Sequence, residues 1–392
     1  MKDNKRLLIF MKTGELKPTG GPAGYNYNLK KELDKMNIEG IDFIESAKGV
    51  DLSKTFTKNH LLKKVRRIIG IFRRTLFYSK LLLKSEVSNK IENNEYDMIH
   101  FHFTEDIFRY RKSLERYSGK VILTSHSPTL ASLQIFDTLT KFEKIIFKPL
   151  YKKLQIMDYF AFERADYIIF PCPEAEEPYY NNWKGYKEFK EKNRHKYRYL
   201  LTGINRCKTK IKREDVRKTY HIPEDAFVIS YVGRHNTIKG YDLLKEMGKE
   251  LLYDKNIYFL VAGNEEPLKG IDNERWIEIG WTSDPHSFIS ASDLFALPNR
   301  ETYFDLVLLE VISLGIPVVA SRTGGNKYFR GSTGIILFDD VKEAIESIRK
   351  VMKMSKQDRK RMGDSNRELF EKNYNCQVFA KAYIRLIDEL EC

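Results

Sequence analysis

Residues 227–244 read FVISYVGRHNTIKGYDLL and carry the clearest structural signal in the chain. An apolar run of strand type ends at Gly233 and Arg234, Lys239 and Gly240 come next, and a helical pattern then begins. Ligands of open α/β sheets bind beyond the carboxyl ends of the strands. Two cations beside a helix N-terminus form a diphosphate site, because the cations and the backbone N–H groups can bind the same phosphate oxygens. The alternative is a pair of surface cations on a loop, since helix ends often carry such residues.

Alternating strands and helices extend on both sides of this stretch. Apolar runs predict strands at 6–11, 41–44, 98–101, 121–124, 167–170 and 200–205, and then at 227–232, 258–263, 276–280, 294–298 and 316–321. Helical patterns separate most of them, which is typical of parallel sheets with helices on both faces. The polar stretch 174–200 predicts no strand, and 200–205 is expected to lead into a hinge.

The fold class that follows is α/β, with two Rossmann-like domains whose parallel sheets face each other across a cleft. We expect an N-terminal domain over 1–203 and a C-terminal domain over 204–372. The stretch 373–392 is expected to be a helix that packs back toward the N-terminal domain.

Composition limits the class of protein. The chain has 392 residues, of which 42% are hydrophobic and 31% charged, as in a soluble globular protein of about two domains. Its four cysteines form no CxxC pair, which favours a reducing compartment and gives no metal-site spacing. The first residues contain a five-residue apolar run, too short for a signal peptide or a membrane span. We therefore expect a cytoplasmic protein.

The net charge of +14 is concentrated in one segment. Residues 52–84 hold ten Lys or Arg and no Asp or Glu. Within 60–84, apolar residues recur at helical spacing among the cations, which predicts a basic amphipathic helix. Such a helix could lie on an anionic membrane surface, at the inner face of the cell membrane, or pack on the N-terminal sheet as an ordinary surface helix. Nucleic acid is not expected, because the segment lacks an aromatic stacking platform and a recognised motif.

A second group of residues lies in 300–329, RETYFDLVLLEVISLGIPVVASRTGGNKYF. Glu310 has Leu309 and Val311 as neighbours, and a carboxylate in an apolar context needs a partner. A pair of sugar hydroxyls is one candidate, and a structural Arg or backbone amide is the other. A Gly-rich turn follows the strand at 316–321.

The order GR…KG, AGN and E…LLE…GIPVVAS…GG resembles glycosyltransferase family 4, the large retaining group of the GT-B fold. The resemblance covers essentially the whole chain and is strongest in the C-terminal half. It implies that Arg234 and Lys239 bind the donor diphosphate, with Gly233 beside them, and that Glu310 holds the nucleotide ribose. It also implies that Trp281 lies near the base. Backbone amides at Phe304, Asp305 and Leu306 would contact the donor sugar.

The sequence departs from this pattern at the first Glu of the family's E-x7-E motif. Thr302 stands at that position, with Glu301 beside it, and Tyr303-Phe304-Asp305 replaces the usual Gly-Phe-Gly. Either Glu301 takes over the role, or a different sugar is held without that carboxylate.

The N-terminal half resembles the family in fewer places. Gly20 and Gly21 match its Gly-Gly loop, and His126, just past a predicted strand, matches a histidine that lies beside the transferred sugar. His100 is expected to be packed in the sheet, and His102 could line the cleft. The resemblance implies a metal-free reaction with no cofactor beyond the nucleotide sugar, in which Arg234 and Lys239 stabilise the leaving diphosphate.

Three functions remain in competition at this point. The first is a glycosyltransferase that uses a nucleotide sugar, with UDP favoured, and a saccharide, glycolipid or glycoprotein acceptor in bacterial surface glycan synthesis. The second is another enzyme of the same fold, such as a sugar-nucleotide epimerase or a phosphorylase. The third is a non-catalytic GT-B subunit or partner protein, to which Thr302 gives some weight.

Overall fold

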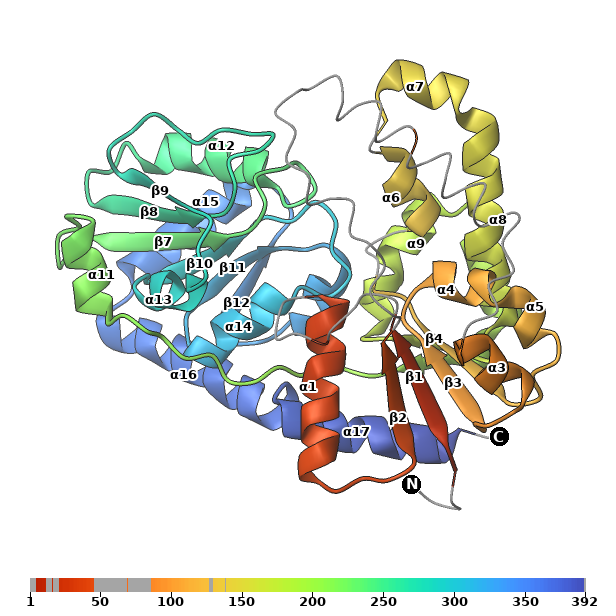
Figure 1. Ribbon diagram of the computed structural model, residues 1–392. Helices are drawn as coiled ribbons and strands as arrows, with labels where there is room; N and C mark the ends of the chain where they lie inside the picture. Colours follow the sequence, from red (N-terminus) through yellow and green to blue (C-terminus); the bar gives the residue numbers. More distant parts are fainter. Residues whose placement is uncertain are drawn as a thin grey trace. The chain divides into compact units, whose positions relative to one another are not determined.

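The chain forms two compact units in a computed structural model (Figure 1). The structure describes residues 5–11, 16, 21–45, 69, 86–126, 130–137 and 139–390. The N-terminal unit consists of Met1–Phe170, Tyr179–Leu200 and Ala380–Cys392, and the C-terminal unit of Pro171–Pro178 and Leu201–Phe379. The chain thus leaves the N-terminal unit and returns to it twice, and its last helix begins in one unit and ends in the other.

The N-terminal unit contains a six-stranded parallel sheet with the order β2-β1-β3-β4-β5-β6. Its strands are β1 (Leu7–Met11), β2 (Ile41–Glu45), β3 (Met98–Phe101), β4 (Lys120–Thr124), β5 (Tyr167–Phe170) and β6 (Tyr197–Tyr199). Leu7, Leu8, Ile9 and Phe10 are all fully buried, as expected of a central parallel strand covered on both faces.

One strand prediction is wrong. The last strand is Tyr197–Tyr199, inside the stretch that predicted none, and residues 200–205 contain only an isolated bridge between Ile204 and Asn375. A Cβ atom on Gly203 would lie 2.5 Å from the Asn375 carbonyl oxygen, so the backbone crosses at close range here instead of pairing along a ladder.

The helices of the N-terminal unit connect these strands. They are α1 (Pro22–Lys35), α3 (Glu86–Glu92), α4 (Thr104–Arg109), α5 (Arg111–Leu114), α6 (Ala131–Asp137), α7 (Lys141–Ile146), α8 (Lys148–Arg164) and α10 (Tyr186–Lys192), with α9 (Glu177–Asn182) at the crossing between the units and the end of α17 (Cys376–Glu389) packed on the sheet. Tyr383 of α17 is fully buried and reaches His100 of β3, which explains why this helix end belongs to the N-terminal unit.

The C-terminal unit also contains a six-stranded parallel sheet, with the order β12-β11-β10-β7-β8-β9. Its strands are β7 (Phe227–Val232), β8 (Ile257–Ala262), β9 (Trp276–Gly280), β10 (Leu294–Leu297), β11 (Val318–Ser321) and β12 (Ile335–Phe338). The sequence predictions did not include β12. Its four residues, IILF, are too short a run to separate from the following helix by periodicity.

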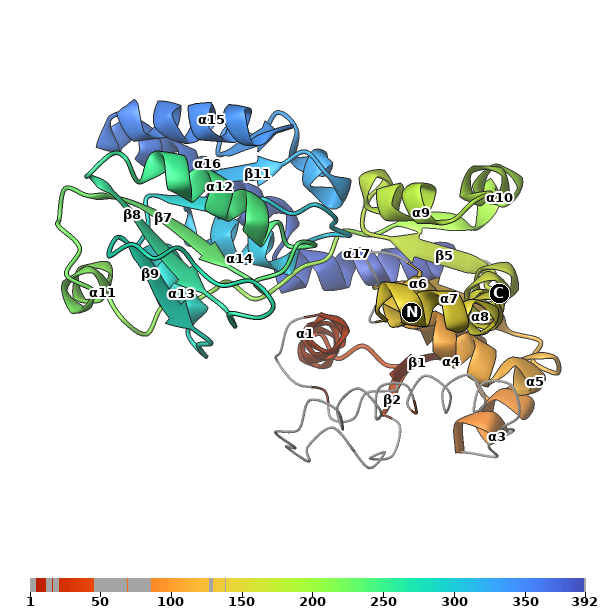
Figure 2. The ribbon, with the colours of Figure 1, turned by 90° about the horizontal axis from the view of Figure 1, so that it is seen from above.

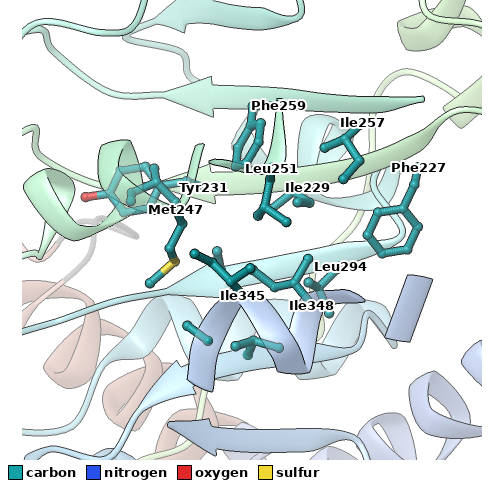
Figure 3. Packing of buried hydrophobic residues seen from close by; sticks show 14 of the residues in the cluster. Phe227, Ile229, Tyr231, Met247, Leu251, Ile257, Phe259, Leu294, Ile345 and Ile348 are labelled. Carbon is teal, nitrogen blue, oxygen red and sulfur yellow. The ribbon is translucent and has the colours of Figure 1, made fainter. Parts of the chain in front are cut away.

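Two layers of helices cover this sheet (Figure 2). The helices are α11 (Arg213–Thr219), α12 (Tyr241–Leu251), α13 (Pro285–Ser290), α14 (Leu306–Leu314), α15 (Val341–Lys353) and α16 (Lys356–Asn373). On one face, Met247 and Leu251 of α12 and Ile345 and Ile348 of α15 pack on the strands (Figure 3). On the other face, α11 and α13 pack against β7 and β8. In open α/β sheets of this kind, ligand sites form at the carboxyl ends of the strands.

The basic segment at 60–84 lies outside the described residues, apart from Ile69. In the described part of the chain, no helix combines the length and the apolar character that a bilayer crossing requires.

Candidate active site

The loop after β7 carries the two cations expected to bind a diphosphate. The Tyr231 hydroxyl donates a hydrogen bond to the Arg234 carbonyl oxygen (3.0 Å), which fixes the turn at the strand end. The Arg234 residue is exposed. Lys239 lies five residues later, directly before Gly240, which is the N-cap of α12 and has φ 64°. The loop therefore presents a guanidinium and an ammonium at the carboxyl edge of the sheet, beside a helix N-terminus.

Lys239 is held by a carboxylate from the neighbouring loop. Its Nζ lies 2.5 Å from Asp305 Oδ2, and Asn299 Nδ2 donates to the same oxygen at 2.7 Å. Burial by itself would raise the pKa of Asp305, but the Lys239 charge and these hydrogen bonds hold that pKa below its usual value. The other Asp305 oxygen accepts a hydrogen bond from Val307 N–H at the start of α14. Asp305 thus places the Lys239 ammonium next to the N-termini of α12 and α14.

The remaining residues of the E-x7-E region are buried to different degrees. Thr302 and Phe304 are 4% and 7% exposed, and Phe304 stacks on Phe329 with ring centroids 5.8 Å apart. Glu301 is half-buried, and Leu306 begins α14. The side chains at 302 and 304 therefore point into the C-terminal unit, and a ligand at this loop would meet chiefly its backbone.

Glu310 lies on α14 and faces a histidine. Its Oε2 is 3.5 Å from His286 Nε2 of α13, and each side chain is 27% exposed. Interactions with Cys207 and with Glu310 raise the pKa of His286 to about 10, against the opposing effect of burial. His286, which the sequence did not indicate, is the ion-pair partner that the structure gives this carboxylate. Trp281, expected near the base, is 73% exposed directly after β9.

A carboxylate that the sequence did not indicate lies at the Gly-rich turn. Glu177 forms an ion pair with Lys327, and its Oε1 accepts hydrogen bonds from Gly324 N–H and the Thr323 hydroxyl, both at 3.3 Å. The same hydroxyl lies 3.1 Å from the Arg300 carbonyl oxygen, so its single proton has two acceptors within reach. Glu177 lies in the polar stretch 174–200, where the sequence shows no apolar periodicity that would predict a site. Only its contacts with Lys327 and the Gly-rich turn in the structure identify it.

The N-terminal unit brings three histidines together at the carboxyl ends of β3 and β4. His102 Nδ1 and His126 Nε2 lie 2.8 Å apart, and the two rings stack. His100 bridges the Tyr383 hydroxyl and the Thr124 hydroxyl, each at 2.8 Å. The ring of Tyr25 in α1 contacts the His126 ring edge-on, with the ring centroids 4.8 Å apart. His102 thus contacts the histidine expected beside the transferred sugar.

The Gly-Gly loop is described in part. Gly21 is the N-cap of α1 with φ 75°, and a Cβ atom there would meet nothing within 4 Å. Gly20 lies outside the described residues.

The histidine cluster gives the N-terminal unit an acid sensitivity that can be measured. Burial lowers the pKa of His100 and of His126 to about 3, and that of His102 well below its usual value. An unfolded histidine titrates near 6.5. These groups therefore contribute full stability above pH 6.5, and that stability is lost as the pH falls from 6.5 toward 3.

From pH 7 to pH 5 we expect the free energy of unfolding to fall by about 2 kcal/mol for each such histidine. Urea unfolding of the wild type and of His100→Gln at pH 7, 6 and 5 measures the contribution of His100 to this pH dependence. The wild type should lose more stability than the variant over this range. Parallel pH dependences would show that His100 is not held neutral by burial.

A cavity in the C-terminal unit lies at the opposite edge of the sheet. Its volume is about 820 Å³, and Arg213, Arg217 and Asp293 contribute to its wall at the amino ends of the strands. Both arginines bind Asp293, at 2.7 and 2.8 Å, and Arg217 also donates to several backbone carbonyls. These two arginines therefore stabilise the fold at the amino ends of the strands, whereas Arg234 and Lys239 lie at the carboxyl ends. Among the described residues, no group of three or more His, Cys, Asp or Glu is arranged to hold a metal ion.

Part of the C-terminal unit is similar to a known family. Residues 226–354 match the family "Glycosyl transferases group 1". The matched range contains Arg234, Lys239, Asp305 and Glu310.

Curated relatives include two glycosyltransferases of polysaccharide biosynthesis. The O-antigen biosynthesis glycosyltransferase WclY of Escherichia coli is 33% identical over 119 residues, which cover 28% of this chain and 33% of WclY. The capsular polysaccharide biosynthesis glycosyltransferase CapM of Staphylococcus aureus is 28% identical over 190 residues, 45% of this chain and 50% of CapM. The chain thus spans a third to a half of the length of these relatives.

Solved structures match nearly the whole chain and show its fold. HepE of Anabaena, solved with UDP and glucose, aligns with a TM-score of 0.65 at 14% identity, over 98% of this chain and 100% of HepE. WaaG, a glycosyltransferase involved in lipopolysaccharide biosynthesis, aligns with a TM-score of 0.61 at 14% identity, with the same coverage. Two six-stranded parallel sheets and these neighbours give the chain the GT-B fold, which confirms the predicted fold class.

Proposed function

We propose that the chain is a retaining glycosyltransferase of family 4 that uses a nucleoside-diphosphate sugar. The observation that carries this is the Arg234 and Lys239 pair beside the α12 N-terminus, inside the region that matches the group 1 glycosyltransferases. A departing diphosphate develops negative charge, and fixed cations and helix N–H groups stabilise it most when they are already in place. Asp305 supplies that placement for Lys239.

The reaction has a simple balance. The bond between the sugar C1 and the diphosphate oxygen breaks, a bond between C1 and the acceptor oxygen forms, and the acceptor proton passes to the leaving phosphate. Arg234 and Lys239 bind the phosphates, Glu310 accepts hydrogen bonds from the ribose hydroxyls, and His126 orients the sugar and acceptor. Backbone amides at Phe304, Asp305 and Leu306 contact the donor sugar, with Glu301 or Thr302 beside it, and Trp281 lies near the base. No metal ion or further cofactor is required.

The donor we favour is a UDP-sugar, because HepE is solved with UDP and with UDP-glucose. The acceptor class we favour is a saccharide or lipid-linked saccharide of a bacterial surface glycan, because WclY and CapM act in O-antigen and capsule biosynthesis. Such an enzyme would work in the cytoplasm, at the inner face of the membrane. Thr302, in place of the first Glu of the E-x7-E motif, gives some weight to the alternative of a non-catalytic GT-B subunit, but the presence of Arg234, Lys239 and Glu310 argues against it.

A panel of donors separates these functions. We expect the purified protein to release UDP from at least one of UDP-glucose, UDP-galactose and UDP-N-acetylglucosamine, with GDP-mannose as the contrasting nucleotide. NMR of the product anomeric proton should show the same configuration as the donor. Nucleotide binding with no turnover on any donor and acceptor would favour the non-catalytic subunit, and conversion of the free donor into its epimer would favour an epimerase.

A further inference from the structure

A group of exposed apolar side chains lies on α7. Phe142, Ile145 and Ile146, spaced i, i+3 and i+4 on this helix, are 71%, 74% and 54% exposed, and we call these three residues the Phe142 patch. They are three of the twelve large hydrophobic side chains that are exposed in the described part of the chain. Scattered exposed apolar residues are ordinary, but a group of them marks an interaction surface.

The patch is followed directly in the chain by residues that pack inward. Phe147 and Leu150 pack on a small core of Ile135, Phe136 and Leu154. The start of α7 is closed by a capping box, in which Thr140 and Glu143 exchange backbone-to-side-chain hydrogen bonds. The outer apolar side chains are therefore not needed for the local fold.

The charge around the patch indicates what covers it. Lys141 and Lys148, which flank the patch in the sequence, are exposed, as are Lys152 and Lys153 in the first turns of α8, and Lys144 is half-buried. Glu143 is the only acidic residue in 141–156, and it is 6% exposed because the capping box uses it. Exposed apolar side chains flanked by lysines match the boundary between headgroups and acyl chains in an anionic bilayer.

The position of the patch matches a role near the acceptor. Helix α8 connects β4 to β5, and its far end lies at the amino end of β4, where Asp166 N–H donates to Val121 oxygen. Its first turn therefore lies toward the carboxyl ends of the strands, where His126 follows β4. A helix of 17 residues is about 25 Å long and a strand of five about 17 Å, so α8 extends past the strand ends and carries α7 there (Figure 1).

We propose that the Phe142 patch docks the N-terminal unit on an anionic lipid surface, with Phe142, Ile145 and Ile146 inserted among the headgroups. This surface is separate from the basic segment at 60–84. Binding to lipid does not depend on the proposed function. The delivery of a lipid-linked acceptor to His126 does rest on that function.

The test uses the full chain and vesicles of phosphatidylcholine with 30% phosphatidylglycerol. Phe142→Ser combined with Ile145→Ser should lower partitioning onto these vesicles at least tenfold, while Tyr253→Ser, which removes a single aromatic ring that is 87% exposed on the C-terminal unit, should leave it unchanged. Phe142→Trp should show a blue-shifted emission on the vesicles and quenching by brominated lipid. Vesicles of pure phosphatidylcholine should bind much more weakly.

Several results would overturn the proposal. They are absence of vesicle binding by the wild type, equal binding by the double variant, or an unshifted emission of the Phe142→Trp variant on bound vesicles. A dimer in sedimentation that the double variant dissolves would identify a second copy of the chain as the occupant instead. Release of UDP from a soluble donor is measured on the same proteins, so failure of docking and failure of the proposed function give different results.

Discussion

Replacing Lys239 or Arg234 with Ala should lower kcat for sugar transfer about 100- to 1000-fold, which is about 3–4 kcal/mol of transition-state stabilisation. The reason is that each cation faces a diphosphate whose negative charge grows as the sugar departs. The interaction is stronger in the transition state than in the ground state, so the loss should fall on kcat and not on KM alone. Steady-state kinetics with the donor identified by the panel measures both constants.

The two variants differ in what else they disturb. Lys239→Ala also removes the partner of Asp305, whose carboxylate is largely buried and would keep Asn299 and Val307 N–H as donors. Some loss of stability is therefore expected for that variant. Arg234 is exposed, and its replacement should change the free energy of unfolding by less than about 0.5 kcal/mol.

Lys249→Ala on the exposed side of α12 is the matched control, because it removes a lysine from the same helix region without facing the proposed phosphate site. It should retain the wild-type kcat. Near-wild-type turnover by Arg234→Ala, in a protein of unchanged stability, would rule out the diphosphate assignment.

The sequence predicted the sheets well because parallel strands are continuous apolar runs. FVISYV and YFLVAG are long enough to stand out, and they form β7 and β8 with shifts of at most one residue. IILF at β12 and YRY at β6 are too short and, for β6, too polar for such a pattern. β6 is an edge strand, so its apolar content is low and only its pairing with β5 reveals it.

The candidate site was predictable only where residues adjacent in sequence carry it. Arg234 and Lys239 lie on one loop, and their spacing from the strand end could be read directly. The Lys239–Asp305 pair joins residues 66 positions apart, and the Glu177–Lys327 pair joins residues 150 apart. Contacts of this range depend on the tertiary fold, and a single sequence contains no signal that pairs the two residues.

The histidines illustrate the same limit. His100 was predicted to be packed in the sheet, and it is fully buried between the hydroxyls of Tyr383 and Thr124. The contact between His102 and His126 could not be foreseen, because it requires the register of β3 against β4, in which His100 pairs with Ile122. Alternation along a strand gives the face on which a residue lies, but not its neighbour on the next strand.

Gly240→Ala should lower the free energy of unfolding of the C-terminal unit by about 2–5 kcal/mol. Gly240 has φ 64°, and a Cβ atom there would lie 1.6 Å from the Pro298 carbonyl oxygen. The left-handed conformation costs a non-glycine residue about 1–2 kcal/mol, and the clash with backbone adds a shift of the loop after β10 or of α12. Because Asn299 follows Pro298 and binds Asp305, this shift would also displace Lys239 and reduce turnover.

Gly331→Ala separates the cost of the left-handed conformation from the cost of the clash, since Gly331 has φ 83° and a Cβ atom there would meet nothing within 4 Å. This variant should lose only the conformational contribution to the free energy of unfolding, about 1–2 kcal/mol, and keep the wild-type kcat. Guanidinium unfolding of both variants measures the difference. Equal losses would mean that the loop after β10 yields to the added methyl group. In that case the close approach of the two loops does not fix the position of Lys239, and the ion pair with Asp305 must hold the lysine by itself.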